Sequence, residues 1–159
     1  MTIKLIGAAC IALAAGKTLR TIFVQRRQEE TLLQKMATAL ATIAREIRWN
    51  HRPIPAILQE LQEEKIVGGY FSEIAQLLNS KNTLQYAWNS AFNSFPIEKE
   101  AVMNITLLGD EEQLVAALEN AAKSLLHALE LRRSKRGEQT KLCVAAAMSA
   151  AGGIILLLL

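Results

Sequence analysis

The last 18 residues of the chain, Leu142 to Leu159, carry no charged side chain. They read LCVAAAMSAAGGIILLLL. At a rise of ~1.5 Å per residue, a helix of that length measures about 27 Å, which is close to the hydrocarbon thickness of a bilayer. The tail therefore predicts a C-terminal transmembrane helix over residues 142–159. The alternative is a helix that is buried in a larger oligomer.

A group of cations precedes this apolar run, as is typical where a helix enters a membrane. Two further arginines follow the N-terminal apolar run. Together they predict a collar at the membrane interface: Arg26, Arg27, Arg132, Arg133, Lys135, Arg136 and Lys141.

The N-terminal apolar run, Leu5 to Gly16, has the length of a signal-peptide core. Lys17 and Arg20 follow it, and Thr21 to Val24 then resumes the apolar character. We expect a retained membrane segment over residues 1–24 in preference to a cleaved signal. Whether this segment spans the bilayer or lies in its interface stays open.

Both apolar ends repeat small residues at every fourth position, which lets helices approach closely in lipid. We expect these faces to pack on each other or on partner helices. The residues are Ala8, Ala12, Gly16, Ala145, Ser149 and Gly153. Cys10 and Cys143 lie in the same runs and are interpreted as small apolar residues, with no disulfide required.

The charges divide the chain into basic ends and an acidic middle. Between Gln28 and Leu131 there are 8 basic and 14 acidic residues, a net charge of 8 − 14 = −6, although the whole chain has a net charge of +3. An acidic domain argues against nucleic acid as a partner. The basic ends place residues 25–141 on the cytoplasmic side by the positive-inside rule. We therefore expect a protein of the cell membrane whose soluble domain faces the cytoplasm.

The sequence pattern of residues 25–141 predicts a helical bundle. With the two membrane segments, the whole chain is expected to be all-α, with about six helices and membrane-embedded ends. No stretch alternates like a strand. The clearest helix has an apolar stripe at helical spacing and ends near Asn50, because Pro53 disfavours helix at the preceding residue. Its stripe consists of Leu33, Met36, Ala37, Leu40, Ile43, Ala44 and Ile47.

Five more helices are expected. They run from about Pro55 to a turn at Gly68-Gly69, from Tyr70 to Leu78, from Leu84 to before Pro96, from Ile97 to Leu108, and from Glu111 onward. Asn82 or Thr83 is the expected cap of the third of these. Asp110 and Gln113 predict a capping box before the last, which is expected to continue into the tail.

A polar and aromatic cluster ends the first soluble helix, and two interpretations of it stay open. In one, Glu46 pairs with a basic neighbour, Trp49 is half-buried and Pro53 shapes a corner. In the other, the cluster is a partner-docking surface with arginine and tryptophan anchors. The cluster comprises Arg45, Glu46, Arg48, Trp49, Arg52 and Pro53.

A catalytic reading of Glu46 with His51 lacks a nucleophile, a metal-ligand set and a phosphate-binding loop. We therefore expect no catalytic residue, no metal, no cofactor and no enzyme activity.

Several motifs, in order along the whole chain, resemble the stage III sporulation protein AB family of endospore-forming bacteria. They are Lys4-Leu5-Ile6-Gly7, Glu46-Ile47-x-Trp49-x-x-x-Pro53-Ile54, Ala87-Trp88, Leu108-Gly109 with Asp110 and Gln113, and Gly152-Gly153-Ile154.

The resemblance implies a component of the secretion-like channel complex between mother cell and forespore, located in the mother-cell membrane. It also implies a soluble domain similar to the cytoplasmic domains of type II secretion and type IV pilus platform proteins. Its implied partners are a cytosolic secretion-type ATPase and other membrane components of the complex; a homo-oligomer is left open. The alternative is a platform-like component of another such machine.

Overall fold

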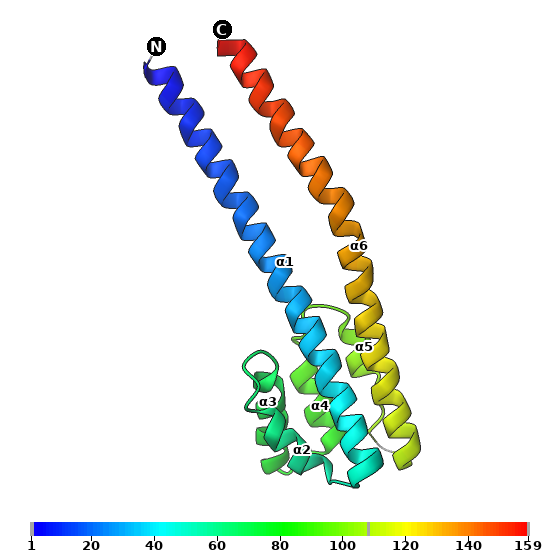
Figure 1. The fold of residues 1–159 in the computed structure, drawn as a ribbon. Helices are drawn as coiled ribbons and strands as arrows, with labels where there is room; N and C mark the ends of the chain where they lie inside the picture. The colour runs from blue at the N-terminus through cyan, green and yellow to red at the C-terminus, as the bar shows by residue number, and fades with distance from the viewer. Residues whose placement is uncertain (1, 108, 159) are drawn as a thin grey trace. The chain divides into compact units, whose positions relative to one another are not determined.

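The computed structural model describes the backbone of residues 2–107 and 109–158, and the side chains of residues 17, 20–107, 109–135, 145 and 149. Over these ranges the chain is helical and contains no strand (Figure 1), so the prediction of an all-α fold with about six helices is confirmed. The helices are α1 (Thr2–Asn50), α2 (Ile54–Leu61), α3 (Gly68–Asn79), α4 (Leu84–Phe92), α5 (Lys99–Met103) and α6 (Glu111–Leu158).

The chain forms two compact units, of which one comprises residues 1–28 with 131–159 and the other residues 29–130. α1 and α6 each contribute to both units. As predicted, α6 continues through Gly137 without a break. In the part of the chain that the structure describes, no helix has both the length and the hydropathy of a bilayer-crossing segment. Most side chains of the predicted membrane segments 1–24 and 142–159 lie outside the described residues.

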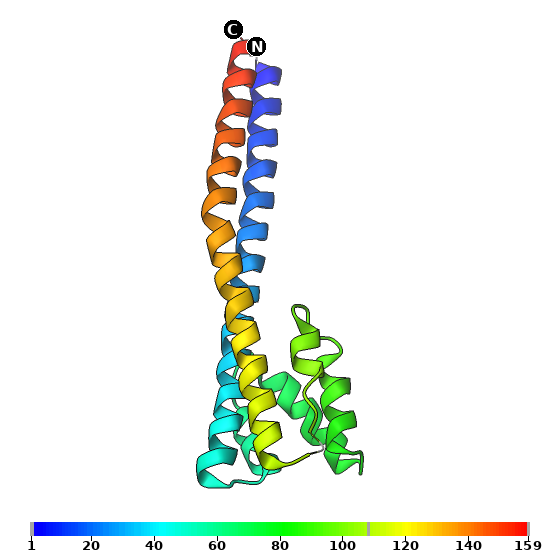
Figure 2. The same ribbon diagram turned by 90° about the vertical axis from the view of Figure 1, so that its right-hand side faces the viewer.

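Within the unit of residues 29–130, the second half of α1 and the first half of α6 run antiparallel. Arg48 and Glu119 join them in an ion pair with a 2.6 Å N···O distance. Figure 2 shows these two stretches together, with α3, α4 and α5 on one side of them. The core of the unit is therefore enclosed between a long helix pair and a layer of short helices.

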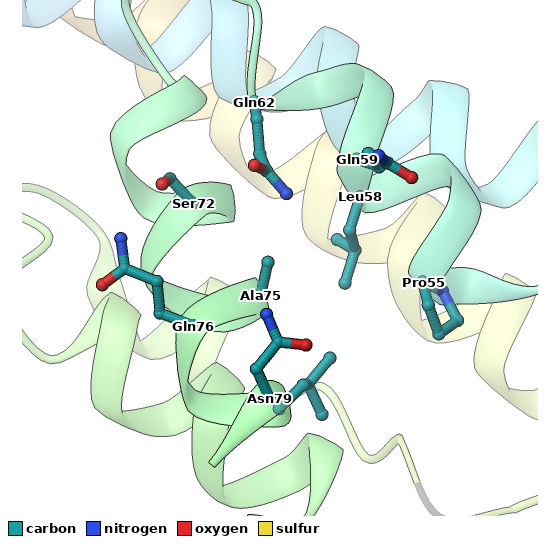
Figure 3. Close-up of a pocket in the computed structure, with 9 residues that line it drawn as sticks. Pro55, Leu58, Gln59, Gln62, Ser72, Ala75, Gln76 and Asn79 are labelled. Carbon is teal, nitrogen blue, oxygen red and sulfur yellow. The ribbon is translucent and has the colours of Figure 1, made fainter.

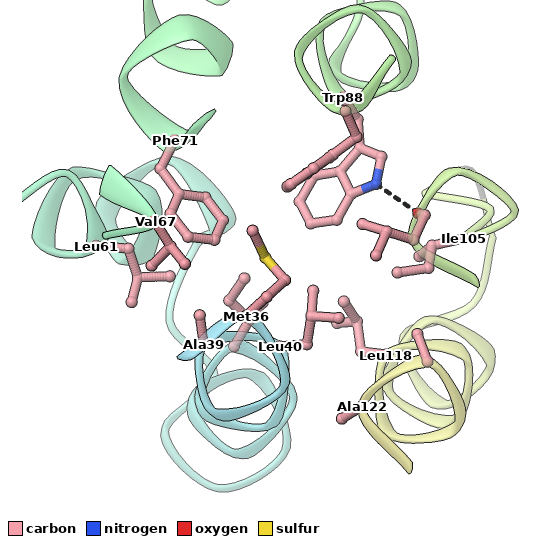
Figure 4. Packing of buried hydrophobic residues seen from close by; sticks show 14 of the residues in the cluster. Met36, Ala39, Leu40, Leu61, Val67, Phe71, Trp88, Ile105, Leu118 and Ala122 are labelled. Carbon is pink, nitrogen blue, oxygen red and sulfur yellow. Dashed lines mark hydrogen bonds between the residues drawn. The ribbon is translucent and has the colours of Figure 1, made fainter. Parts of the chain in front are cut away.

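The predicted apolar stripe of α1 faces this core, because all seven of its residues are buried, with at most 5% exposure. Figure 4 shows Met36 of α1 reaching between Phe71 of α3 and Trp88 of α4. Leu40 points toward Ile105 and Leu118. The helical period of the sequence thus determines which side of α1 is buried.

Aromatic rings fill the layer of short helices. Phe92 stacks on Tyr70 with ring centroids 5.5 Å apart, and meets Trp88 at 4.7 Å and Phe95 at 6.1 Å. Trp88, Phe92 and Phe95 are at most 3% exposed, which confirms their predicted place in the core. Burial raises the pKa of the Tyr70 hydroxyl, and nearby Glu73 adds to the shift.

Two helices end in left-handed residues that are not glycine. His51 follows α1 with φ 46°, and its N–H donates to the carbonyl of Ile47. Lys81 follows α3 with φ 61°, where Lys81 and Asn82 donate to the carbonyls of Leu78 and Leu77. These are the αL and Schellman arrangements that satisfy the last helical carbonyls.

The predicted turn at Gly68-Gly69 was wrong, since both glycines belong to the first turn of α3. A Cβ on Gly68 would lie 2.3 Å from the backbone oxygen of Gln62, whereas a Cβ on Gly69 would meet nothing within 4 Å. Gly68 is therefore needed for the close approach of α3 to the end of α2, and its freedom to form a turn is not used.

The predicted helix from Ile97 to Leu108 was also too long, because α5 spans only Lys99–Met103. After it, the side chain of Gln85 donates to the carbonyl of Ile105 at 3.1 Å and accepts from the N–H of Leu107 at 2.7 Å. One carboxamide thus satisfies two backbone groups that a longer helix would have paired internally.

Candidate functional site

The predicted cluster Arg45–Pro53 lies on the last two turns of α1 and on the corner that leads into α2. Pro53 is the residue before α2, with extended backbone angles of φ −65° and ψ 137°. The corner therefore forms as the sequence predicted. The structure divides the cluster into residues with internal partners and residues that face solvent.

Arg52 connects α1 to α2 through two carboxylates. Its guanidinium is 2.6 Å and 3.1 Å from the two oxygens of Glu60, and 3.4 Å from Oε2 of Glu46. A hydrogen bond from Asn50, and then the charge and hydrogen bond of Arg52, lower the pKa of Glu46. A hydrogen bond from Arg52 is the main reason that the pKa of Glu60 is lowered. The predicted pairing of Glu46 with a basic neighbour is therefore present.

Arg48 and His51 connect α1 to α6. Arg48 pairs with Glu119, and Nδ1 of His51 lies 3.1 Å from Oε1 of Glu111. A pocket of about 730 Å³ opens beside them, lined also by Asp110 and Glu112. Among the described residues, no group of three or more His, Cys, Asp or Glu side chains could hold a metal ion.

Trp49 and Arg45 have a different environment. Trp49 is 73% exposed, so the interpretation of a half-buried tryptophan was wrong. Arg45 is exposed one helical turn earlier on the same side of α1. Within the described part of the chain Arg45 makes no ion pair, although its charge contributes to the low pKa of Glu46. We call Arg45 and Trp49 the Arg45–Trp49 surface.

The structure describes only part of the other predicted site residues. Ala145 and Ser149 are exposed, while the side chains of Ala8, Ala12, Gly16 and Gly153 lie outside the described residues. In the collar, Arg26, Arg27, Arg133 and Lys135 are exposed and Arg132 is half-buried. The side chains of Arg136 and Lys141 lie outside the described residues.

Sequence reasoning missed a second surface feature, a groove between α2 and α3. Polar residues on each side line it at helical spacing: Gln59 on α2 and Gln62 at its C-terminal cap, and Ser72, Gln76 and Asn79 on α3 (Figure 3). Their spacing of three, four and seven residues was a detectable signal. The sequence alone does not show that these two faces pack side by side and so form a groove.

The comparisons with known proteins identify one family. The family model described as stage III sporulation protein AB matches residues 4–159. No curated protein and no solved structure matches the chain.

Proposed function

The chain belongs to the stage III sporulation protein AB family, and from that membership we propose that it is a non-catalytic, membrane-anchored assembly component of the channel complex between mother cell and forespore. Its soluble domain would face the mother-cell cytoplasm and dock a cytosolic secretion-type ATPase. The observation that carries the docking role is the exposure of Trp49, which directly follows the buried stripe of α1 from Leu33 to Ile47.

An exposed tryptophan beside an arginine that makes no ion pair within the described residues is a favourable anchor for a protein partner. Trp and Arg dominate the residues that contribute most to the free energy of binding at interfaces. Trp49 leaves most of its surface in water, although burial of a large aromatic side chain stabilises by ~1.5–3 kcal/mol. A partner that covers it would gain much of this free energy.

The neighbouring ion pairs support this surface and do not compete with it. Arg48 is held by Glu119 on α6, and Arg52 by Glu60 on α2. The last turn of α1 is therefore fixed from both sides before a partner arrives, so little conformational entropy is lost on binding. Arg45, which forms no ion pair with a carboxylate among the residues that the structure describes, would receive one from the partner.

The membrane role is proposed from the sequence of the two ends. The uncharged run 142–159 has the length of a bilayer-crossing helix. Arg26, Arg27, Arg132 and Arg133 all belong to the unit that contains both termini. Cations on one side of two apolar segments favour retention of that side in the cytoplasm.

Docking is tested by co-purification of the full chain with the ATPase from sporulating cells. We expect Trp49→Ala to abolish co-purification and block sporulation while helical content by circular dichroism stays unchanged. Tyr86→Ala is the matched control, because Tyr86 is an exposed aromatic residue on α4, at 58%. Full ATPase recovery with Trp49→Ala would refute the proposed surface.

Membrane topology is tested with a reporter placed in the turn at Ser80-Lys81-Asn82. This turn is tolerant because Ser80 and Lys81 are exposed and α3 has already ended. We expect a membrane-bound, full-length protein with a cytosolic reporter. A reporter on the outer face, or a protein released without detergent, would contradict the proposed orientation or the anchor.

A further inference from the structure

The two compact units of the chain carry charges of opposite sign. Residues 1–28 and 131–159 contain 10 basic residues and 1 acidic residue, a net charge of 10 − 1 = +9. Residues 29–130 contain 8 basic and 14 acidic residues, a net charge of 8 − 14 = −6. The boundary set by the packing of the backbone therefore coincides with a change of charge. The unit that contains both termini is strongly cationic, which favours an anionic partner.

The arginines of the collar lie together at one end of this cationic unit. Its first stretch ends at residue 28 and its second stretch begins at residue 131. Arg26-Arg27 and Arg132-Arg133 therefore lie at the same end of the unit, where both helices leave it. Three of these four side chains are exposed and that of Arg132 is half-buried.

Positive charge remains at this end after every nearby carboxylate is counted. Each of the four arginines also interacts within the chain, so the site does not depend on unpaired guanidinium groups. Residues 26–30 and 130–141 contain 7 basic and 4 acidic residues, which leaves an excess of 7 − 4 = 3 positive charges. A guanidinium presents its N–H groups in a planar fork that matches two oxygens of a phosphate. The collar therefore suits a phosphate-bearing ligand.

Exposed apolar side chains accompany both arginine pairs. Ile22, Phe23 and Val24 precede the first pair and are 42%, 39% and 49% exposed. Leu131 directly precedes the second pair and is 49% exposed. These are four of the eight large hydrophobic side chains that are exposed in the described part of the chain. A free anion or a nucleic acid would leave them in water, whereas a phospholipid covers them and also offers its phosphate to the arginines.

We propose that the collar binds phospholipids whose headgroup carries a net negative charge. The phosphate of such a lipid pairs with Arg26-Arg27 and Arg132-Arg133, and its acyl chains lie against Ile22 to Val24 and Leu131. Clusters of cations beside a membrane helix attract anionic lipid in this way. This inference rests on the proposed membrane anchor and adds to it a preference among lipids.

The test uses the full chain in a neutral detergent with equal amounts of phosphatidylglycerol and phosphatidylcholine that have the same acyl chains. Native mass spectrometry counts the molecules of each lipid that stay bound. We expect at least ~10-fold more phosphatidylglycerol than phosphatidylcholine, because the collar attracts the headgroup with a net negative charge. Neither inorganic phosphate nor a DNA duplex should displace the lipid at constant ionic strength, since neither covers the apolar side chains. Displacement by either would overturn lipid as the occupant.

Variants separate the contribution of charge from that of apolar contact. Replacement of all four arginines by glutamine should leave the two lipids about equally bound, with helical content by circular dichroism unchanged. The matched control removes four exposed cations from residues 29–130: Lys65→Gln, Lys81→Gln, Lys99→Gln and Lys123→Gln. It should keep the preference. Phe23→Ser with Leu131→Ser keeps every charge and should lower the number of bound lipids of both kinds; unchanged binding would refute the contact with acyl chains.

Extraction with sodium carbonate from vesicles of phosphatidylcholine alone distinguishes this inference from the anchor. The parent protein and the variant without the four arginines should both stay in the vesicles, because the uncharged run 142–159 is unaltered. Release of the parent protein would refute the proposed anchor. Equal retention of the two lipids by a parent protein that resists extraction would overturn the lipid preference alone.

Discussion

The indole Nε1 of Trp88 donates a 2.9 Å hydrogen bond to the carbonyl oxygen of Val102, drawn as a dashed line in Figure 4. Val102 belongs to α5, a helix of five residues, so its carbonyl is one of the last four that lack a partner within the helix. The largest buried side chain therefore also serves as the C-terminal cap of the shortest helix.

Replacement of Trp88 by Phe should lower the free energy of unfolding by ~1–3 kcal/mol, because the Val102 carbonyl then stays buried without a donor. Guanidinium unfolding of the full chain in detergent, followed by circular dichroism, measures this change. Trp49→Phe is the control on the other tryptophan, and we expect a change within about 0.5 kcal/mol at that exposed position. Equal effects of the two substitutions would contradict the capping role.

The two adjacent glycines should respond oppositely to alanine. In Gly68→Ala the new Cβ meets the Gln62 carbonyl oxygen at 2.3 Å, and the forced separation of α2 and α3 should cost about 1–3 kcal/mol. In Gly69→Ala the Cβ enters open space, and the helix should gain up to about 1 kcal/mol. Thermal unfolding of both variants measures these opposite changes in stability. A Gly68→Ala protein as stable as the parent would show that the helices separate easily.

Replacement of Lys81 by glycine should stabilise the protein. Its φ of 61° is left-handed, a conformation that costs an L-residue with a side chain ~1–2 kcal/mol. Lys81→Gly removes this strain and should raise the free energy of unfolding by about 0.5–1 kcal/mol after the entropy of glycine is subtracted. Ser80→Gly, at φ −83° one residue earlier, lacks any strain to relieve and should be destabilising. Loss of stability in both variants would refute the argument.

The Glu46–Arg52–Glu60 network makes stability depend on pH in a defined direction. Both carboxyl groups have pKa values below the ordinary 4.5. Their contribution is therefore fully present above about pH 4.5 and is lost as the pH falls through the lower, folded-state values. Arg52→Met should raise both pKa values, measured by NMR titration of the carboxyl carbons.

The same variant should differ from the parent protein less at pH 3 than at pH 7, since protonated carboxyl groups no longer attract Arg52. Lys123→Met, an exposed position on α6, is the control and should leave both titrations unchanged. A Glu60 titration that does not respond to Arg52→Met would contradict the network.

Periodicity predicted the elements whose position is decided by one buried face. α1 and α6 were placed correctly because their apolar residues recur at helical spacing and are buried, from Leu33 to Ile47 and from Leu114 to Leu129. The same helical spacing also predicts that Trp49 is exposed. Trp49 lies two residues after Ile47, about 200° around the helix, so it falls off the buried stripe.

The errors occurred where a distant residue decides the local structure. α5 is short because Trp88 and Gln85 satisfy backbone groups between Val102 and Leu107. Gly68 lies in α3, and its missing Cβ leaves room for the backbone of Gln62 at the end of α2. Neither contact can be predicted from the local pattern of hydrophobic residues. The α2–α3 groove was missed for the same reason, since it exists only once two helices are packed.

The short helices pair in chain order, α2 with α3, α3 with α4, and α4 with α5. Contacts between sequence neighbours close short loops, and such topologies fold rapidly. The contact between α1 and α6 joins residues that are far apart in the sequence, as the ion pair of Arg48 with Glu119 shows. During synthesis the middle of the domain can therefore assemble as it leaves the ribosome, and the arrival of α6 completes the core around an already ordered layer.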